Sequence, residues 1–239
     1  MASRVHVLLL RPADEPPPPR PSERLVLAHI PLLDVVYLDE GLASLESLLP
    51  RCDWLVYTSF RGVRATSRLS RLISRLRREG GLRIAAVGER TAREVREVLG
   101  SPPDLVPREY RGAVLAEELL AERPRCVVFA RSARGLREPV EMLRSAGVEV
   151  HDVPVYDMVV LGRMVEAAVA AAPSFDYVVF TSPSIVEAFM SRWGGGRLRA
   201  AAIGPTTAEA LRRRGVEPVV VARVYTLEAL LSEILERHK

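Results

Sequence analysis

The chain has 239 residues, of which 48% are hydrophobic and 27% charged, with a formal net charge of +4 at pH 7. This composition excludes a disordered chain and leaves room for one large domain or two of ordinary size. No apolar run approaches the roughly 20 residues of a membrane span, and the N-terminus lacks the pattern of a signal peptide, so we expect a cytoplasmic protein without membrane contacts.

Short apolar runs alternate with helical patterns along the chain. Because they lack strict alternation, these runs predict strands that are covered on both faces, as in parallel sheets. In chain order the predicted strands are Val5–Leu10, Leu25–His29, Trp54–Ser59, Arg83–Gly88, Asp104–Val106, Cys126–Ala130, Val148–Asp152, Tyr177–Ser182, Ala200–Gly204 and Glu217–Val221. The alternation of strands and helices favours an α/β fold.

Helical patterns fill most of the intervening segments. Residues 133–147 show helical periodicity and end in Gly147, a residue typical of helix C-termini, and residues 226–238 show a second clear helix. The segment Arg11–Ile30 differs, because four successive prolines, Pro16–Pro19, forbid a helix and favour an extended chain.

The sequence repeats itself over nearly its whole length. Segments that begin at His6, Ile30, Asp53, Gly88 and Pro107 match segments that begin at Cys126, Val153, Asp176, Gly204 and Ala222. The matches occur at similar offsets, which predicts two equivalent α/β units. The proline segment breaks the symmetry, so we expect a loop in one unit where the other has a helix.

Cysteine, histidine and arginine give no metal or nucleic-acid signal. Cys52 and Cys126 lack metal-ligand spacing, and we interpret both as reduced, buried thiols at strand starts. The four histidines show no pairing pattern, so we expect structural or surface roles for them. Lys239 is the only lysine, and the arginines are scattered over helical patterns without interleaved aromatic residues, which indicates solvated helix faces and no nucleic-acid partner.

Four strand-to-helix turns carry small polar residues. Thr58-Ser59 and Thr181-Ser182 end two predicted strands, and the Gly88–Thr91 and Gly204–Thr207 turns end two more. Helix N-termini offer unsatisfied N–H groups that bind carboxylates, and parallel sheets bind ligands at the carboxyl ends of their strands. Helix capping explains the same residues without any ligand.

Several of these segments together resemble uroporphyrinogen-III synthases. The resemblance is carried by residues 147–159, 176–189 and 201–215, and more weakly by residues 53–63 and 85–92. It implies two similar flavodoxin-like domains, each a five-stranded parallel sheet flanked by helices, joined by a two-stranded linker. The implied bounds are residues 1–33 plus 162–239 for one domain and 39–153 for the other, with linkers at 34–38 and 154–161.

The resemblance also implies a reaction. The family converts hydroxymethylbilane, a linear tetrapyrrole with eight carboxylates, to uroporphyrinogen III, with loss of water and inversion of the terminal pyrrole ring. This would make the protein a cyclising hydro-lyase that uses no metal and no organic cofactor, and we expect a monomer. Two other classes stay open: a small-molecule-binding protein of the same duplicated design, and a regulatory protein on this fold that binds a tetrapyrrole or small anion without turnover.

Tyr156 is the catalytic residue that we predict. It lies on the second linker, where its hydroxyl would enter a cleft between the domains and donate a hydrogen bond to the leaving oxygen, whereas the matching residue, Leu33, has no hydroxyl. Packing of a linker aromatic is the alternative. The predicted substrate-binding residues are Thr58, Ser59, Arg61, Thr91, Arg131, Thr181, Ser182, Ser184, Thr206 and Thr207, with Arg11 as a weaker candidate.

Overall fold

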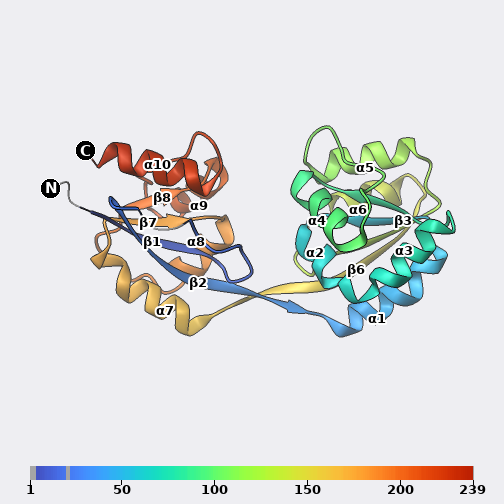
Figure 1. Ribbon diagram of the computed structural model, residues 1–239, viewed down its shortest axis with the longest axis horizontal. Helices are drawn as coiled ribbons and strands as arrows, with labels where there is room; N and C mark the ends of the chain where they lie inside the picture. The colour runs from blue at the N-terminus through green and yellow to red at the C-terminus, as the bar shows by residue number, and fades with distance from the viewer. Residues whose placement is uncertain (1–3, 20–21, 239) are drawn as a thin grey trace. The chain divides into compact units, whose positions relative to one another are not determined.

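The computed structural model describes residues 4–19 and 22–238. Within these residues the chain forms nine strands (Figure 1). They are β1 (Val5–Pro12), β2 (Leu25–Tyr37), β3 (Trp54–Tyr57), β4 (Arg83–Ala86), β5 (Cys126–Ser132), β6 (Glu149–Val160), β7 (Tyr177–Phe180), β8 (Ala200–Ala202) and β9 (Val220–Val221).

Ten α-helices lie between the strands of the described chain. They are α1 (Asp39–Leu48), α2 (Phe60–Ala65), α3 (Ser70–Arg78), α4 (Glu89–Leu99), α5 (Gly112–Ala121), α6 (Glu138–Ser145), α7 (Gly162–Ala171), α8 (Pro183–Met190), α9 (Pro205–Arg213) and α10 (Leu227–Arg237), with short 3-10 turns at Leu49–Arg51, Ser67–Leu69 and Ala172–Ser174. Of the helices in this described part, none is long and apolar enough to cross a membrane.

The nine strands follow the hydrogen-bonding order β4-β3-β5-β6-β2-β1-β7-β8-β9. Every pair with a recorded register is parallel, which confirms the predicted α/β class. The chain divides into two compact units. Unit 1 comprises the described residues up to Val35 and from Met158 onward, and unit 2 comprises Val36–Asp157.

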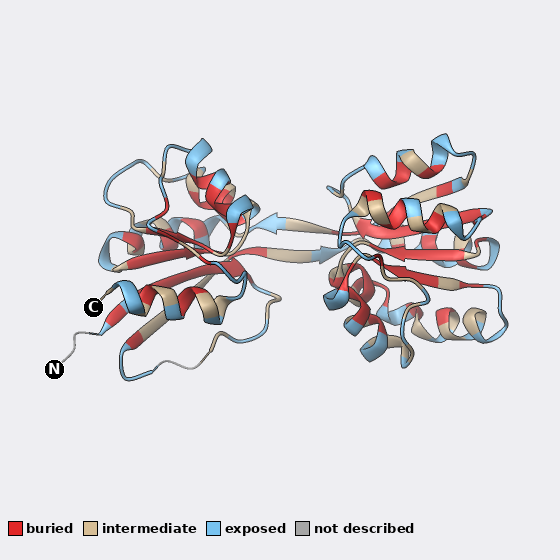
Figure 2. Cartoon of the chain, turned by 90° about the horizontal axis from the view of Figure 1, so that it is seen from above, coloured by how far each residue is buried: buried red, intermediate tan, exposed pale blue. Residues whose placement is uncertain are grey.

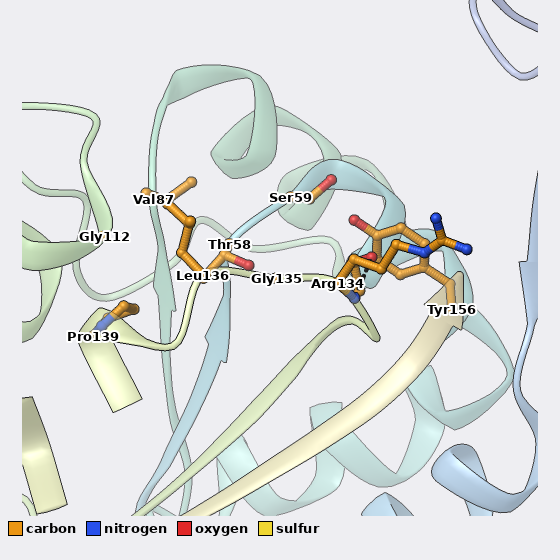
Figure 3. A pocket seen from close by; sticks show the side chains of 10 residues that line it. Thr58, Ser59, Val87, Gly112, Arg134, Gly135, Leu136, Pro139 and Tyr156 are labelled. Atoms are coloured by element: carbon orange, nitrogen blue, oxygen red, sulfur yellow. Dashed lines mark hydrogen bonds between the residues drawn. The ribbon is translucent and has the colours of Figure 1, made fainter. Parts of the chain in front are cut away.

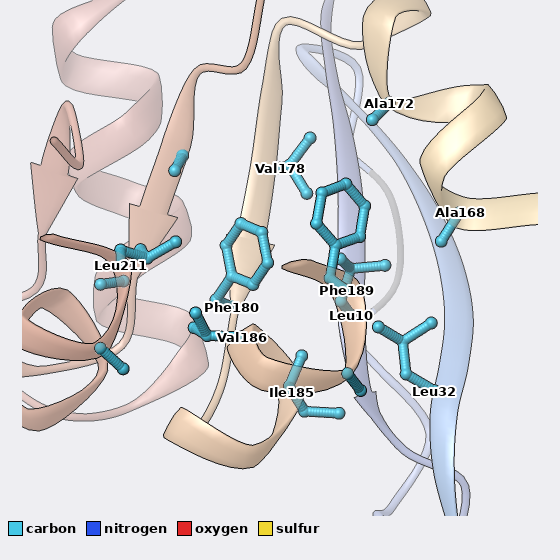
Figure 4. Close-up of a cluster of buried hydrophobic side chains, with 14 of the residues drawn as sticks. Leu10, Leu32, Ala168, Ala172, Val178, Phe180, Ile185, Val186, Phe189 and Leu211 are labelled. Atoms are coloured by element: carbon cyan, nitrogen blue, oxygen red, sulfur yellow. The ribbon is translucent and has the colours of Figure 1, made fainter. Parts of the chain in front are cut away.

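Unit 1 holds β1, β7, β8 and β9 and most of β2. Its largest apolar cluster packs Leu10, Phe180 and Phe189 with small residues of α7 and α9 (Figure 4), and the two phenylalanine rings meet edge to face with centroids 5.4 Å apart. Pro16–Pro19 form no regular element, as their missing N–H groups predict. A loop therefore connects β1 to β2.

Unit 2 holds β3, β4, β5 and most of β6, and these strands are largely buried (Figure 2). One apolar cluster packs residues of the strands with residues of α5 and α6. The prediction of a fifth strand in this unit, Asp104–Val106, is wrong. Only Leu105 pairs with a neighbouring strand, through an isolated bridge to Ala85. The amide groups of Asp104 and Leu105 both donate to the Ile84 carbonyl, and prolines on either side of the segment leave no N–H groups to extend the ladder.

The repeat appears in both units as the same backbone connection. In unit 2, the Asp53 carboxylate accepts from the Cys126 amide at 2.8 Å, and the Asp53 amide donates to the Cys126 carbonyl. In unit 1, Asp176 and His6 make the same two bonds, at 2.8 and 2.9 Å. Each aspartate thus fixes the start of its own strand against the neighbouring strand.

Candidate functional site

A cavity of about 310 Å³ lies in unit 2 at the carboxyl ends of β3, β4, β5 and β6. Its walls are Thr58, Ser59, Val87, Gly112, Ser132, Arg134, Gly135, Leu136, Pro139 and Tyr156 (Figure 3). This edge is where parallel α/β sheets bind ligands. Three of the residues predicted from the sequence, Thr58, Ser59 and Tyr156, meet in this one cavity.

Tyr156 enters the cavity because of a bulge. The register between β5 and β6 shifts between Arg131 and Ser132, so that Ser132 lies opposite Tyr156, and the Ala133 amide donates to the Tyr156 carbonyl at 2.9 Å. Bulges re-aim side chains near active sites. The ring is only 5% exposed and reaches from β6 towards Arg134 (Figure 3). Among the described residues, its hydroxyl makes no hydrogen bond, so it is available to a ligand.

Thr58 and Ser59 follow β3 directly. The Ser59 hydroxyl accepts from the Arg61 amide at 3.2 Å and caps α2. The capping explanation therefore holds for Ser59, although the residue also lines the cavity. Thr58 lines the cavity without capping the helix, because Ser59 occupies the N-cap position.

Thr91 lies inside a helix rather than at its cap. Gly88 is the N-cap of α4, and no side chain caps this helix terminus. The N–H groups of the first turn keep their capacity to bind an anion, while Thr91 itself is buried. Val87, which precedes Gly88, brings this turn to the cavity wall.

The two arginine candidates of unit 2 differ in burial. Arg131 is 4% exposed, and its guanidinium donates to both oxygens of Asp152 at 2.5 Å and to the Leu136 carbonyl at 2.6 Å. These contacts favour a structural role. Arg61 is partly exposed, with its guanidinium 4.7 Å from the centre of the Phe60 ring.

The predicted residues of unit 1 lie on two helix starts. The Thr181 hydroxyl donates to the Leu10 carbonyl at 3.0 Å, and Ser182 caps α8 by accepting from the Ile185 amide at 3.3 Å. Ser184 is exposed, with its hydroxyl 3.5 Å from that of Ser182. The start of α8 thus has one hydroxyl that caps the helix, that of Ser182, and one that is exposed, that of Ser184.

The second helix start of unit 1 copies the α4 turn. Gly204 is the N-cap of α9 with no capping side chain, and Pro205 is the first helical residue, as the sequence predicts. Thr206 is exposed at this terminus, whereas Thr207 is 1% exposed. Thr206 is therefore the threonine of this pair that can reach a ligand.

Seven residues of the cavity wall were not predicted from the sequence. They are Val87, Gly112, Ser132, Arg134, Gly135 and Leu136, together with Pro139 at the start of α6. Most of these residues lie at the end of β5 or in the polar, glycine-containing loop that follows it. This loop could have been predicted to line a site, because loops after parallel strands build ligand sites. Arg134 is the exposed arginine of that loop, and its Nε lies 3.2 Å from Asp157.

The prediction of reduced cysteines is wrong. Cys52 and Cys126 form a disulfide, with Cα atoms 4.6 Å apart and a sequence separation of 74. Both are buried, as predicted. Cys52 lies two residues before β3 and Cys126 is the first residue of β5, and the two strands are parallel neighbours, which brings the two cysteines together. Cys52, Cys126 and His151 form a group whose potential metal-ligand atoms lie close together. The His151 Nε2 lies 2.8 Å from a carboxylate oxygen of Glu149.

A second buried arginine occupies the equivalent place in unit 1. Arg11 is 6% exposed, and its Nε donates to His29 Nε2 at 3.4 Å, while its guanidinium also donates to the Pro16 carbonyl. Burial, and secondly the Arg11 charge, lower the pKa of His29. Burial also lowers the pKa of Arg11, although the Glu15 charge opposes this change. A neutral imidazole thus stands where unit 2 has a carboxylate.

Comparisons with known proteins agree on one family. Residues 26–232 match the profile of the family described as uroporphyrinogen-III synthase HemD. The chain is 23% identical over 219 residues to a predicted uroporphyrinogen-III synthase of Methanocaldococcus jannaschii, and the match covers 85% of each protein.

Two crystal structures share the fold. A uroporphyrinogen III synthase mutant from Thermus thermophilus is 19% identical with a TM-score of 0.62, and the match covers 98% of both chains. A uroporphyrinogen-III synthetase from Helicobacter pylori is also 19% identical, with a TM-score of 0.65 over 99% of this chain and 100% of that one. Because the family profile covers most of the sequence, the chain belongs to the uroporphyrinogen-III synthase family.

Proposed function

We propose that the protein cyclises hydroxymethylbilane to uroporphyrinogen III, and that the reacting end of the substrate lies in the unit 2 cavity. The observation that carries this proposal is the position of Tyr156. A β-bulge turns its ring into the cavity, beside the two polar residues that end β3, and leaves its hydroxyl without a partner among the described residues.

The chemistry requires a donor near the leaving group. The terminal hydroxymethyl carbon loses its oxygen as water, and the cation that remains is attacked by pyrrole carbon to form the inverted ring. A tyrosine hydroxyl can act as a hydrogen-bond donor. Tyr156 donates its hydrogen bond to the departing oxygen, which stabilises the charge that develops there.

The substrate is a polyanion, and the free N–H groups at helix N-termini can bind its carboxylates. We propose that substrate carboxylates bind at the uncapped turns of α4 and α9, with Thr206 exposed at the second turn. Thr58, Ser59 and Ser184 are proposed as hydroxyl donors and Arg61 as a charge partner. Thr181 and Ser182 support these contacts by fixing the start of α8, and Arg131 by fixing the loop after β5. Thr91 and Thr207 do so as buried residues of the first turns of α4 and α9.

The proposal includes no cofactor. Loss of water followed by carbon–carbon bond formation leaves the overall oxidation state unchanged, so the reaction calls for neither an electron donor nor an acceptor. Positioning of the flexible chain supplies much of the acceleration. We accordingly assign the protein to the cyclising hydro-lyases.

The two-domain organisation is part of the proposal. The limits of the compact units, at Val35 and Asp157, fall within the two segments expected to be linkers, residues 34–38 and 154–161. We propose that the units are two flavodoxin-like domains derived from one duplicated sequence. The equivalent strand-start bonds of Asp53 and Asp176 support this origin.

Replacement of Tyr156 by phenylalanine tests the proposed role. We expect Tyr156→Phe to lower kcat several-fold with little change in KM or melting temperature, because the ring still fills its place while the donor is lost. The matched control is Tyr37→Phe, since Tyr37 is an exposed tyrosine of β2 outside the cavity. Initial rates with freshly made hydroxymethylbilane give the comparison. Equal kcat values for the wild type and Tyr156→Phe would remove Tyr156 from the mechanism.

A further inference from the structure

Two tyrosines outside the predicted site are exposed in the same way in both units. Tyr110 is 64% exposed and precedes α5, and Tyr225 is 65% exposed and precedes α10. The two residues occupy equivalent positions of the repeat. A single exposed aromatic residue needs no explanation, but two in equivalent places do.

Each tyrosine ring lies against the glycine that begins a helix. A Cβ atom on Gly88 would approach the Tyr110 ring to 3.0 Å, and one on Gly204 would approach the Tyr225 ring to 3.2 Å. Contacts this short are tighter than ordinary van der Waals contact, so the absence of a side chain at each glycine leaves space for the ring. These glycines are the uncapped N-termini of α4 and α9.

The two loops that carry Tyr110 and Tyr225 have equivalent main-chain hydrogen bonds. The Arg111 amide donates to the Glu109 carbonyl at 2.7 Å and the Thr226 amide to the Val224 carbonyl at 2.8 Å, so that each tyrosine is the centre of a three-residue turn.

A glutamate of the following helix then holds the start of each loop. Glu118 accepts from the Arg108 amide and Glu233 from the Arg223 amide, both at 3.1 Å. The rings are thus fixed in place while most of their surface faces solvent, an arrangement that holds a binding surface ready for a ligand.

In unit 2 this ring stands next to the cavity. Val87, the neighbour of Gly88, and Gly112, two residues after Tyr110, both line the cavity wall, at the end away from Tyr156 and Arg134 (Figure 3). The Tyr110 ring packs against Gly88, the residue that follows Val87, so it lies beside this end of the cavity wall.

We propose that Tyr110 and Tyr225 are stacking platforms for the pyrrole rings of the substrate. This inference rests on the proposed function, because it assigns the substrate class as a chain of flat, electron-rich rings that bear carboxylates. Each platform pairs an aromatic face with an adjacent uncapped helix start, so that ring and carboxylate of one pyrrole unit are bound together.

Leucine and phenylalanine substitutions distinguish stacking from simple coverage of the glycine. Tyr110→Leu and Tyr225→Leu are expected to raise KM about tenfold, whereas Tyr110→Phe and Tyr225→Phe stay within about twofold of wild type, because only phenylalanine keeps the aromatic face. Tyr37→Leu is the control, with an exposed tyrosine far from either glycine turn in sequence. The melting temperatures of all variants should match that of the wild type.

Binding of uroporphyrin III, followed by its fluorescence, provides the second readout. The leucine variants should bind it about tenfold more weakly and the phenylalanine variants as the wild type does. Leucine variants that match Tyr37→Leu in both KM and porphyrin affinity would overturn the proposal. A wild-type protein that forms no uroporphyrinogen III would instead count against the proposed function, and the porphyrin affinities would still decide the role of the tyrosines.

Discussion

Leu33 in unit 1 and Tyr156 in unit 2 stand at the same point of the same structure. In both units the register shifts by one residue where a strand is about to end, between Arg11 and Pro12 in one and between Arg131 and Ser132 in the other. Leu33 is buried in the apolar cluster of its unit, whereas Tyr156 lines a cavity. The two units share this backbone feature and differ in the side chain that it holds and in the surroundings of that side chain.

The same contrast extends to the residues around each bulge. A buried arginine ends both strands, but it meets Asp152 in unit 2 and His29 in unit 1. The strand starts are held by an equivalent aspartate in both units, but unit 2 adds the Cys52–Cys126 disulfide where unit 1 has Phe175 and His6. The main-chain bonds are therefore equivalent in the two units, while the side chains that surround them differ.

The largest expected difference between the units comes from the disulfide. A cross-link over 74 residues removes enough entropy from the unfolded chain to contribute about 4 kcal/mol to the free energy of unfolding. Reduction should therefore lower the melting temperature of the wild type. Cys126→Ser should melt at the reduced value with and without reductant. Equal melting of the oxidised and reduced wild-type protein would mean that the cross-link adds nothing.

Removal of the carboxylate in unit 2 should destabilise more than removal of the imidazole in unit 1. Asp152→Ala leaves the buried Arg131 charge without its partner and should lower the free energy of unfolding by about 3 kcal/mol. His29→Ala removes one long hydrogen bond to a neutral group, so we expect about 1 kcal/mol or less.

An exposed pair provides the control for this comparison. Arg83 and Glu122 are both more than 40% exposed, so Glu122→Ala should change stability by less than about 1 kcal/mol. Chemical denaturation of the three variants gives the ranking. A loss for Asp152→Ala no larger than that for Glu122→Ala would show that the buried pair is not a stabilising feature of unit 2.

The smallest expected effect is a dependence of unit 1 on pH. Because the pKa of His29 is lowered on folding, the unfolded chain binds more protons than the folded chain as pH falls below the ordinary imidazole value. The stabilising contribution is present above that value and is lost as pH falls through the lowered pKa. His29→Gln should reduce the loss between pH 7 and pH 5 (approximate limits set by the imidazole range). Identical pH profiles for variant and wild type would contradict this assignment.

The fold could be predicted because its signals are local. Apolar runs gave the strands of both units, and the prolines at Pro16–Pro19 excluded a helix. The segment Asp104–Val106 was the exception, since its apolar pattern is real but the prolines around it leave no amides to extend the pairing. An apolar run thus indicates where a segment can pair with a strand, but it does not say how many residues will pair.

The site was only partly visible in the sequence. Tyr156 was found because it breaks the repeat at Leu33, and its place in the cavity depends on a bulge that no sequence pattern announces. Arg131 was predicted because it follows a run of strand residues, but its side chain is buried against Asp152, and it is Arg134 that lines the cavity. The disulfide was not predicted because Cys126 of β5 and Cys52, two residues before β3, are neighbours only in space.

The central claim is that the wild-type protein directs ring inversion. The measurement is the isomer composition of the uroporphyrinogen formed from freshly made hydroxymethylbilane, determined after oxidation to uroporphyrin. We expect mainly the type III isomer. Formation of the type I isomer alone, which is the product of spontaneous closure, would contradict it and would favour a protein that binds tetrapyrroles without turnover.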